Sequence, residues 1–385
     1  MEQKQNNPLL SIIIPTKNRY ETLIPVLECT LNYLSSNKYE IIIQDNSEDN
    51  SVIQNYLHLN KDSRLKYFYH MESLSITENS NRAIENSSGE YAVFIGDDDL
   101  VSPYIIEITE YIAEQNIDCL IYPPAYYWWS SVNFTVKSYY RRKNAFWLPN
   151  NINFELQKKN ASKELVNVLK NGGGSLYSLP RFYHGLVKRK VLEQMKNKIG
   201  TYISGSCPDM ALAASLALFL DSYFYIQYPV SVFGASKNSG GGWVQEKKHL
   251  GKLEDQKHLP DNILNIWDKN IPHLWTVDTI YAQAIHETFL LFNEDRRINY
   301  NALYASMIVN ESSTFFYVCY KIINYNKLYI IRYFILFFYF FRKFIGKILR
   351  IYREKRKKMP YDVFIINDVN NCMQFLEQNT PIKIN

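Results

Sequence analysis

The chain has 385 residues, of which 46% are hydrophobic and 21% charged, so it is a globular protein rather than a disordered one and has room for one large domain or two ordinary ones. The net charge of +5 is local, because nine Lys or Arg lie between Arg342 and Lys358, which argues against a general nucleic-acid surface. Five scattered cysteines without a CxxC pair disfavour a cysteine-based zinc site and fit a reducing compartment.

Strand and helix patterns alternate through the first hundred residues. Continuous apolar, β-branched runs indicate buried strands, and apolar residues at helical spacing indicate the helices between them. The expected strands are 9–14, 39–44, 65–69 and 90–95, and the expected helices are 20–34, 50–59 and 75–86. This alternation predicts an open α/β sheet, whose ligands bind beyond the carboxyl ends of the strands.

Polar residues follow three of these strands. They are 15–19 ("PTKNR"), 44–47 ("QDNS") and 96–99 ("GDDD"). Because the carboxyl ends of parallel strands share one edge of a sheet, these loops are expected to meet in a functional crevice.

Asp97, Asp98 and Asp99 are adjacent, although each carboxylate makes the others harder to ionise. The three acids could form a solvated turn, or the last could cap a helix that begins near Ser102 and Pro103. A positive group among them, above all a divalent metal ion, is the third interpretation.

The region after residue 119 has a weaker pattern. The aromatic segments 125–131 and 138–149 read as strands or loops, and 171–175 ("NGGGS") as a turn. A helix opens near Pro208 and Asp209, and a strand-like stretch follows it. Residues 237–243 ("KNSGGGW") read as a loop whose glycines allow backbone to approach a ligand closely, before a polar helical region that reaches residue 325.

The segments "SIIIPTKNR", "EIIIQDNSEDNS" and "NRAIENSSGEYAVFIGDDD", and more weakly "CPDMALAASL", resemble the inverting family 2 glycosyltransferases of the GT-A fold, bacterial enzymes that use nucleotide sugars. The resemblance covers the first hundred residues and extends loosely to residue 240. It implies an α/β fold: a GT-A (Rossmann-like) nucleotide-sugar-binding domain with a mostly helical C-terminal extension.

The resemblance also implies roles for individual residues. The nucleotide-sugar pocket would contain Pro15, Thr16, Arg19, Asp45, Asn81, Asp97 and Asp98, with Asp45 accepting from the base, usually uracil. Asp45 could instead only close its loop as an Asx turn. The acid cluster matches the family's metal motif, so Asp99 and Asp97 are expected to hold Mn²⁺ or Mg²⁺ against the diphosphate, although Gly96 stands where many relatives have an aspartate.

An inverting transfer needs a base that deprotonates the acceptor hydroxyl. Asp209 matches the family's acid at the start of a later helix, with Pro208 in place of the usual Glu, and the alternative is that Asp209 serves only its helix. On the acceptor side we expect His184, which could also be a buried structural histidine, and Lys237 near the diphosphate.

The stretch 327–360 combines a short apolar run with many basic residues, and its run is too short for a spanning helix. Arg332, Lys343, Lys347 and Arg350 fall near one helical face. These features predict a helix that lies in an anionic membrane surface, or alternatively a domain-packing helix with a solvated basic end.

The sequence therefore predicts a GT-A domain at 1–240, a helical extension at 241–326, a membrane-associating segment at 327–360 and a C-terminal tail at 361–385. The expected protein is a metal-dependent inverting transferase on the inner face of a bacterial cell membrane. We expect it to pass a sugar from a UDP-linked donor to a glycan or lipid-linked acceptor of a surface polysaccharide. The alternatives are an inactive membrane-attached scaffold and a nucleotidyltransferase. The N-terminal residues lack a signal pattern, which predicts a cytoplasmic protein.

Overall fold

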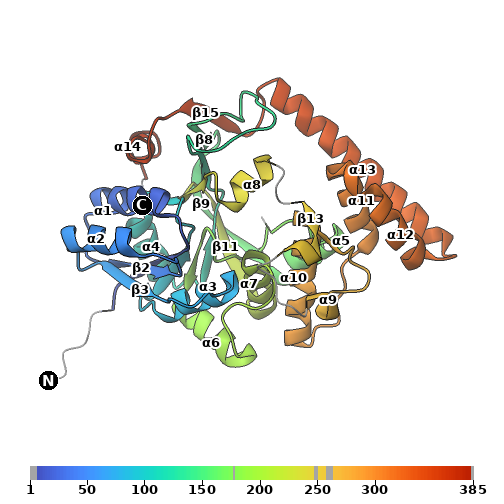
Figure 1. Ribbon diagram of the computed structural model, residues 1–385, viewed down its shortest axis with the longest axis horizontal. Coiled ribbons are helices and arrows are strands. Elements are labelled where there is room, and N and C mark those ends of the chain that lie inside the picture. Colours follow the sequence, from blue (N-terminus) through green and yellow to red (C-terminus); the bar gives the residue numbers. More distant parts are fainter. Residues whose placement is uncertain (1–6, 177, 247–249, 257–262, 383–385) are drawn as a thin grey trace.

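An eight-stranded sheet forms the centre of the computed structural model, which describes residues 7–176, 178–246, 250–256 and 263–382 (Figure 1). The strand order is β3-β2-β1-β4-β10-β6-β11-β9. The neighbouring pairs β2–β3, β1–β2 and β1–β4 are parallel, whereas β10 runs antiparallel to β4 and β6. The strands are β1 (Leu10–Thr16), β2 (Tyr39–Asp45), β3 (Leu65–Tyr69), β4 (Tyr91–Phe94), β6 (Cys119–Ile121), β9 (Asn153–Asn160), β10 (Gly185–Lys188) and β11 (Ser222–Gln227).

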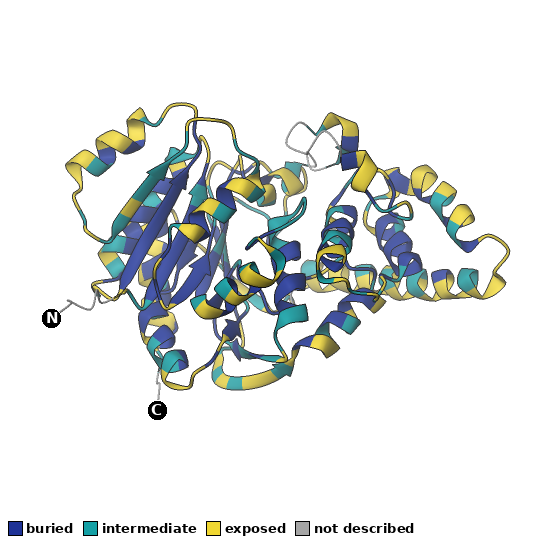
Figure 2. Cartoon of the chain, turned by 90° about the horizontal axis from the view of Figure 1, so that it is seen from below, coloured by how far each residue is buried: buried dark blue, intermediate teal, exposed yellow. Residues whose placement is uncertain are grey.

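The apolar runs form these strands because both faces of the sheet are covered by helices, and Figure 2 shows the central strands as buried. Ile12 and Ile41 pack with α1 on one face, and Ile13 and Ile42 pack with α3 and α6 on the other. The covering helices are α1 (Tyr20–Tyr33), α2 (Ser51–Leu59), α3 (Ile76–Glu85), α4 (Ile105–Glu114) and α6 (Arg189–Ile199). The strands and helices expected in the first hundred residues are all present, with ends that differ by a few residues.

A second sheet, ordered β15-β8-β7-β12-β5, stands beside the first. Its strands are β5 (Leu100–Val101), β7 (Ala125–Trp128), β8 (Ala145–Pro149), β12 (Ser231–Ala235) and β15 (Tyr361–Ile365). The last strand comes from the segment expected to be a C-terminal tail. It pairs with β8, and α14 (Val369–Asn379) then buries Cys372, Met373 and Leu376 in the core that α1 shares. The end of the chain therefore returns to the first domain.

A helical unit surrounds a core of its own. In that core Leu165 of α5 and Met210 of α7 pack with Ile285 of α10 and Leu303 of α11, so helices from both sides of residue 240 share it. The helices are α5 (Ala161–Lys170), α7 (Pro208–Phe219), α9 (Ile263–Ile266), α10 (Val277–Phe292), α11 (Tyr300–Asn310), α12 (Phe315–Asn326) and α13 (Ile330–Lys355). A short ribbon, β13 (Gly251–Lys252) with β14 (Leu274–Trp275), adjoins them.

The glycine-rich stretch after β12 differs from the expected loop. Its three glycines begin a helix, α8 (Gly240–Glu246), although residues 236–239 remain a turn. In this helix Gly242 lies where an added Cβ would stand 1.9 Å from the Ser236 carbonyl oxygen, so the glycine permits a close backbone contact within the protein.

Candidate active site

The loops after β1, β2 and β4 meet at the carboxyl edge of the sheet. The backbone N–H of Asn46 donates to the Thr16 carbonyl oxygen (3.0 Å), and the Asn18 N–H donates to Ser47 Oγ (2.7 Å). Thr16 Oγ1 donates to Asp97 Oδ2 (2.7 Å), which joins the first loop to the acid cluster. The three predicted loops therefore come together at this edge of the sheet.

Arg19 is the cation among the aspartates. Its Nη1 lies 2.9 Å from Asp97 Oδ1 and its Nη2 lies 2.9 Å from Asp98 Oδ2. The same Nη2 donates to Ser236 Oγ (3.0 Å), beyond the end of β12. This guanidinium neutralises part of the charge that makes three adjacent buried acids unfavourable.

Strand β12 of the second sheet closes the other side of the cluster. The Gly234 N–H donates to Asp99 Oδ1 (2.6 Å), and the Ser236 N–H donates to Asp98 Oδ2 (2.9 Å). A Cβ on Gly234 would stand 1.6 Å from the Asp98 carbonyl oxygen, so only glycine allows β12 to come this close.

Tyr183 and His184 reach the acids from the turn before β10. Tyr183 donates its hydroxyl to Asp99 Oδ2 (2.8 Å), and His184 Nε2 lies 3.1 Å from the same oxygen. His184 Nδ1 lies 2.6 Å from Ser231 Oγ. The backbone of His184 has φ 52°, a left-handed conformation that is uncommon outside glycine and that turns the ring towards Asp99.

These contacts divide the three acids electrostatically. Burial raises the pKa of Asp97 to about 7 and also raises that of Asp98, although Arg19 acts against both shifts. Burial would raise the pKa of Asp99 too, but His184 and the N–H groups of Gly96 and Gly234 hold it below its ordinary value. The protein therefore favours the ionised form of Asp99, whereas burial disfavours the charge on Asp97 and Asp98.

Asp209 stands in the first turn of α7, after Pro208 at the start of the helix. Its carboxylate makes no hydrogen bond to the protein among the residues that the structure describes, and the helix has no side-chain cap. Its pKa is raised to about 6, first by removal from water, while His184 lowers it and Asp99 raises it. The carboxylate is thus free to bind another partner. Asp209 does not act as a hydrogen-bonding cap of α7.

Asp45 is fully buried beneath the loop of β2. Its Oδ2 accepts from the hydroxyls of Tyr20 (2.6 Å) and Tyr67 (2.8 Å), and its Oδ1 accepts from the Ser47 N–H (2.9 Å). The Ser47 contact is the Asx turn that the sequence left as an alternative. Oδ1 retains capacity for a second donor, so base recognition by Asp45 stays a prediction.

Asn81 binds the loop 201–203, which precedes Asp209 in the sequence. Its Oδ1 accepts from the N–H groups of Tyr202 and Ile203 and from the Thr201 hydroxyl, while its Nδ2 donates to the carbonyls of Thr77 and Ile203. Because both ends of the amide are used within the protein, Asn81 positions this loop rather than presenting a free group to a ligand.

The remaining two predicted residues lie at the rim. Pro15 is a half-buried residue of β1, paired with Gln44 of β2. Lys237 is exposed after β12, and its backbone N–H donates to Ser131 Oγ (3.2 Å). Ser236, Tyr183 and Gly234 contact the acids without having been predicted; an isolated glycine in a strand was the signal that could have revealed Gly234.

A divalent ion does not fit the acids as they are arranged here. Four donors surround the Asp99 carboxylate, and Arg19 engages both Asp97 and Asp98. Within the described residues no three His, Cys, Asp or Glu side chains gather as ligands. Dependence on Mn²⁺ or Mg²⁺ stays a prediction from the resemblance, and it requires Arg19 to release the two acids.

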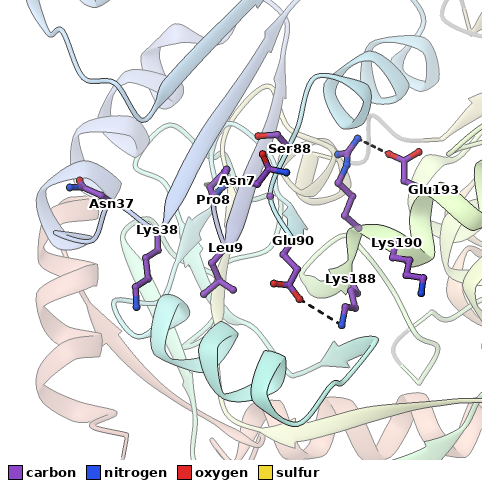
Figure 3. Close-up of a pocket in the computed structure, with 12 residues that line it drawn as sticks. Asn7, Pro8, Leu9, Asn37, Lys38, Ser88, Glu90, Lys188, Lys190 and Glu193 are labelled. Atoms are coloured by element: carbon purple, nitrogen blue, oxygen red, sulfur yellow. Dashed lines mark hydrogen bonds and ion pairs between the residues drawn. The ribbon is translucent and has the colours of Figure 1, made fainter. Parts of the chain in front are cut away.

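A separate hollow of about 730 Å³ opens at the opposite edge of the sheet, near the starts of β1 and β4 and the end of β10 (Figure 3). Three of its four basic side chains are paired with acids: Lys188 with Glu90, Arg189 with Glu193 and Lys38 with Glu110. Ligands of open α/β sheets bind at the carboxyl edge, so the hollow is not the site that the acids form.

The strand-end acids thus lie in an α/β protein with a mostly parallel central sheet. Residues 11–177 match the family model described as "Glycosyl transferase family 2". This part, less than half of the chain, is therefore similar to family 2 glycosyltransferases.

Several named proteins are similar to parts of the chain. A protein of Escherichia coli named as the colanic acid biosynthesis glycosyl transferase WcaA is 34% identical over 99 residues, which cover 26% of this chain and 36% of that protein. The GalNAc(5)-diNAcBac-PP-undecaprenol beta-1,3-glucosyltransferase of Campylobacter jejuni is 36% identical over 96 residues, or 24% of this chain and 30% of that one. The cholesterol galactosyltransferase of Borreliella burgdorferi is 24% identical over 235 residues, or 59% and 62%. In each case the chain spans less than two thirds of the relative.

Among solved structures, S. aureus TarS 1-349 in complex with UDP-GlcNAc has a TM-score of 0.43 and 15% sequence identity, and the superposition covers 73% of this chain and 72% of that one. The complex of the same protein with UDP has a TM-score of 0.41 and 16% identity, covering 59% and 61%.

Proposed function

We propose that the protein is an inverting glycosyltransferase that moves a sugar from a nucleotide sugar, UDP-linked in our proposal, to a hydroxyl of a glycan or lipid-linked acceptor. The observation that carries the proposal is the position of Asp209. Its carboxylate has a pKa of about 6 and is near enough to His184 and Asp99, which belong to the strand-end acid cluster, for both to shift that pKa. This proximity supports a base and a donor site at one edge of a sheet whose sequence is similar to family 2 glycosyltransferases.

The donor is proposed to bind over the loops of β1, β2 and β4. Thr16 and Asp45 belong to the β1 and β2 ends, where a nucleoside would lie along the carboxyl edge. Arg19 offers a guanidinium beside Asp97 and Asp98, and a guanidinium pairs well with phosphate oxygens. Binding of a diphosphate in this way exchanges one set of anionic partners of Arg19 for another.

Asp209 is proposed as the general base. It would take the proton of the acceptor hydroxyl while that oxygen forms a bond to the anomeric carbon, and the bond from this carbon to the diphosphate breaks on the opposite face. A pKa of about 6 leaves the carboxylate ionised at neutral pH but still basic enough to accept a proton. The ring of His184 is held between Ser231 and Asp99, and it therefore keeps one position near the proposed base.

The acceptor class is proposed from the relatives. One is named for an undecaprenol-linked acceptor and one for colanic acid biosynthesis. A lipid-linked intermediate of a surface polysaccharide, met at the cytoplasmic face of the cell membrane, is the corresponding acceptor for this chain.

The test is a transfer assay with purified protein, a panel of UDP- and GDP-sugars and short lipid-linked acceptors, with Mn²⁺, Mg²⁺ or chelator. Wild type should release nucleotide and extend an acceptor with one donor. Asp209→Asn should lose transfer but keep the thermal stabilisation that the same donor gives the wild type. Donor binding without transfer by the wild type under any condition would favour the inactive scaffold, and absence of donor binding would refute the transferase.

A further inference from the structure

Helix α13 exposes a continuous apolar face. The helix is 26 residues long and forms the outer edge of the helical unit (Figure 1). Large side chains recur on its outer side at helical spacing, and Phe334 and Phe338 are 67% and 63% exposed. We define the α13 apolar face as Ile331, Phe334, Phe337, Phe338, Phe341, Phe344, Ile345, Ile348, Leu349 and Tyr352, all of which are exposed. Such a patch is far larger than soluble proteins ordinarily leave uncovered.

The polar residues of the opposite side are turned towards the protein. Arg332 Nη1 donates to the Tyr325 carbonyl (2.6 Å), Lys343 Nζ to the Asn171 carbonyl (3.3 Å) and Lys347 Nζ to the Val309 carbonyl (2.5 Å). Leu336 packs in the helical core beside them. These three basic residues, which the sequence places on one helical face, thus bind α13 to the helical unit. The apolar side of the helix is therefore on the outside.

Basic residues border the C-terminal part of the α13 apolar face. Arg353 lies at one edge of the face, Lys355 lies at its C-terminal end, and Arg356 and Lys358 follow the helix, all exposed. The single acid in the sequence of α13 is Glu354, which is engaged by Ser138 Oγ (2.8 Å) and lies 3.5 Å from Arg141. The face therefore combines large apolar area with uncompensated positive charge.

We propose that the α13 apolar face docks onto a lipid bilayer that contains anionic headgroups. The aromatic and aliphatic side chains would enter the boundary between headgroups and acyl chains, while the basic edge pairs with anionic lipid. A second copy of this chain is less suited to the face, because the one acid of its α13, Glu354, is already engaged by Ser138 and Arg141 and does not meet the basic residues. No helix in the described parts of the chain is long and apolar enough to cross a membrane. This inference does not depend on sugar transfer.

The experiment is co-sedimentation of the full chain with vesicles of phosphatidylcholine alone or mixed with phosphatidylglycerol. Wild type should bind the mixed vesicles more tightly than the neutral ones, and salt should weaken that preference. Phe338→Glu with Phe341→Glu should weaken binding at least about a hundred-fold, since each Phe loses its burial in lipid. Leu59→Glu, at a residue 71% exposed on α2, is the control for an added charge and should bind like wild type.

A charge variant separates the contribution of the basic residues to vesicle binding from that of the apolar side chains. Arg353→Ser with Lys355→Ser should lower affinity for anionic vesicles about thirty-fold and leave affinity for neutral vesicles unchanged. Lys61→Ser with Lys66→Ser makes the same change in net charge on the exposed far side of the sheet and should have little effect. Melting temperatures check that all variants are folded, because every substituted side chain is exposed.

Three results would overturn the proposal. They are absence of binding to either vesicle, binding that the Glu variants leave intact, and a wild-type dimer that ignores vesicles and is dissociated by the Glu variants. The last would assign the face to a second copy. A wild type that binds neither vesicle but still transfers sugar to a soluble acceptor would refute the docking surface alone and leave the proposed function standing.

Discussion

Replacement of Asp97 by Asn is expected to stabilise the protein at neutral pH while it damages the site. Burial raises the pKa of Asp97 from 3.8 to about 7, even though Arg19 acts in the opposite direction. The folded protein therefore binds this proton more tightly than the unfolded chain does. The resulting penalty is absent below the unfolded pKa near 3.8, grows as pH rises, and is complete above about 7.

The difference corresponds to about 4 kcal/mol of unfolding free energy at alkaline pH, as an upper value. Asn can keep the local contacts, because its amide oxygen can accept from Arg19 Nη1 and its amide N–H groups can donate to the Thr16 hydroxyl oxygen. What disappears is the buried charge. The gain in stability should thus arise from removal of a functional group that the fold tolerates at a cost.

The assay is urea unfolding of wild type and Asp97→Asn with chelator present, at about pH 4 and about pH 8. Asp97→Asn should be more stable than wild type at the higher pH and equal to it at the lower one. The control is Asp118→Asn, an exposed carboxylate, which should show no such pH dependence. A variant that is less stable than wild type at the higher pH, or a gain of equal size at both, would refute the reasoning.

Three other measurements test the site. The transfer rate of the wild type should rise with pH through about 6, as Asp209 loses its proton, and a rate independent of pH in this range would remove Asp209 as the base. Gly234→Ala should lower the unfolding free energy by about 1–3 kcal/mol, because the added Cβ meets the Asp98 carbonyl oxygen. Gly240→Ala is the control and should lower it little, because no atom lies within 4 Å of the added Cβ. Equal losses for the two variants in urea unfolding would contradict the close approach of β12 to Asp98. Asn81→Ala should lower the rate of transfer (kcat) more than it weakens donor affinity (KM), because it releases the loop before α7. An equal effect on kcat and KM would indicate that Asn81 contacts the donor.

The carboxyl edge of the sheet could be predicted from sequence because its cause is local. Apolar β-branched runs such as 10–14 become parallel strands when both faces are covered, and the residues after each strand must then share an edge. Thr16, Arg19 and Asp97 accordingly come together. The sequence could not assign the contacts of Asn81, because its amide is satisfied by residues 120 positions further along the chain.

The cation that compensates the three aspartates could not be identified from the sequence either. Adjacent acids require compensation wherever they are buried, and that requirement is visible in "GDDD". Which cation meets it depends on how the β1 loop folds back, and here the guanidinium of Arg19 reaches both Asp97 and Asp98. A side chain 78 residues away leaves no spacing signal in the acid motif itself.

The sequence by itself determined the α/β order of the first domain, the loops that form its crevice and the apolar, basic character of residues 327–360, because periodicity and composition act over a few residues. Only the tertiary structure decided that the end of the chain returns as β15 and α14, that β12 crosses the acids at Gly234, and that Lys343 and Lys347 turn inward. These outcomes depend on pairings between distant segments, and they are settled by which surfaces remain to be covered once the sheet has formed.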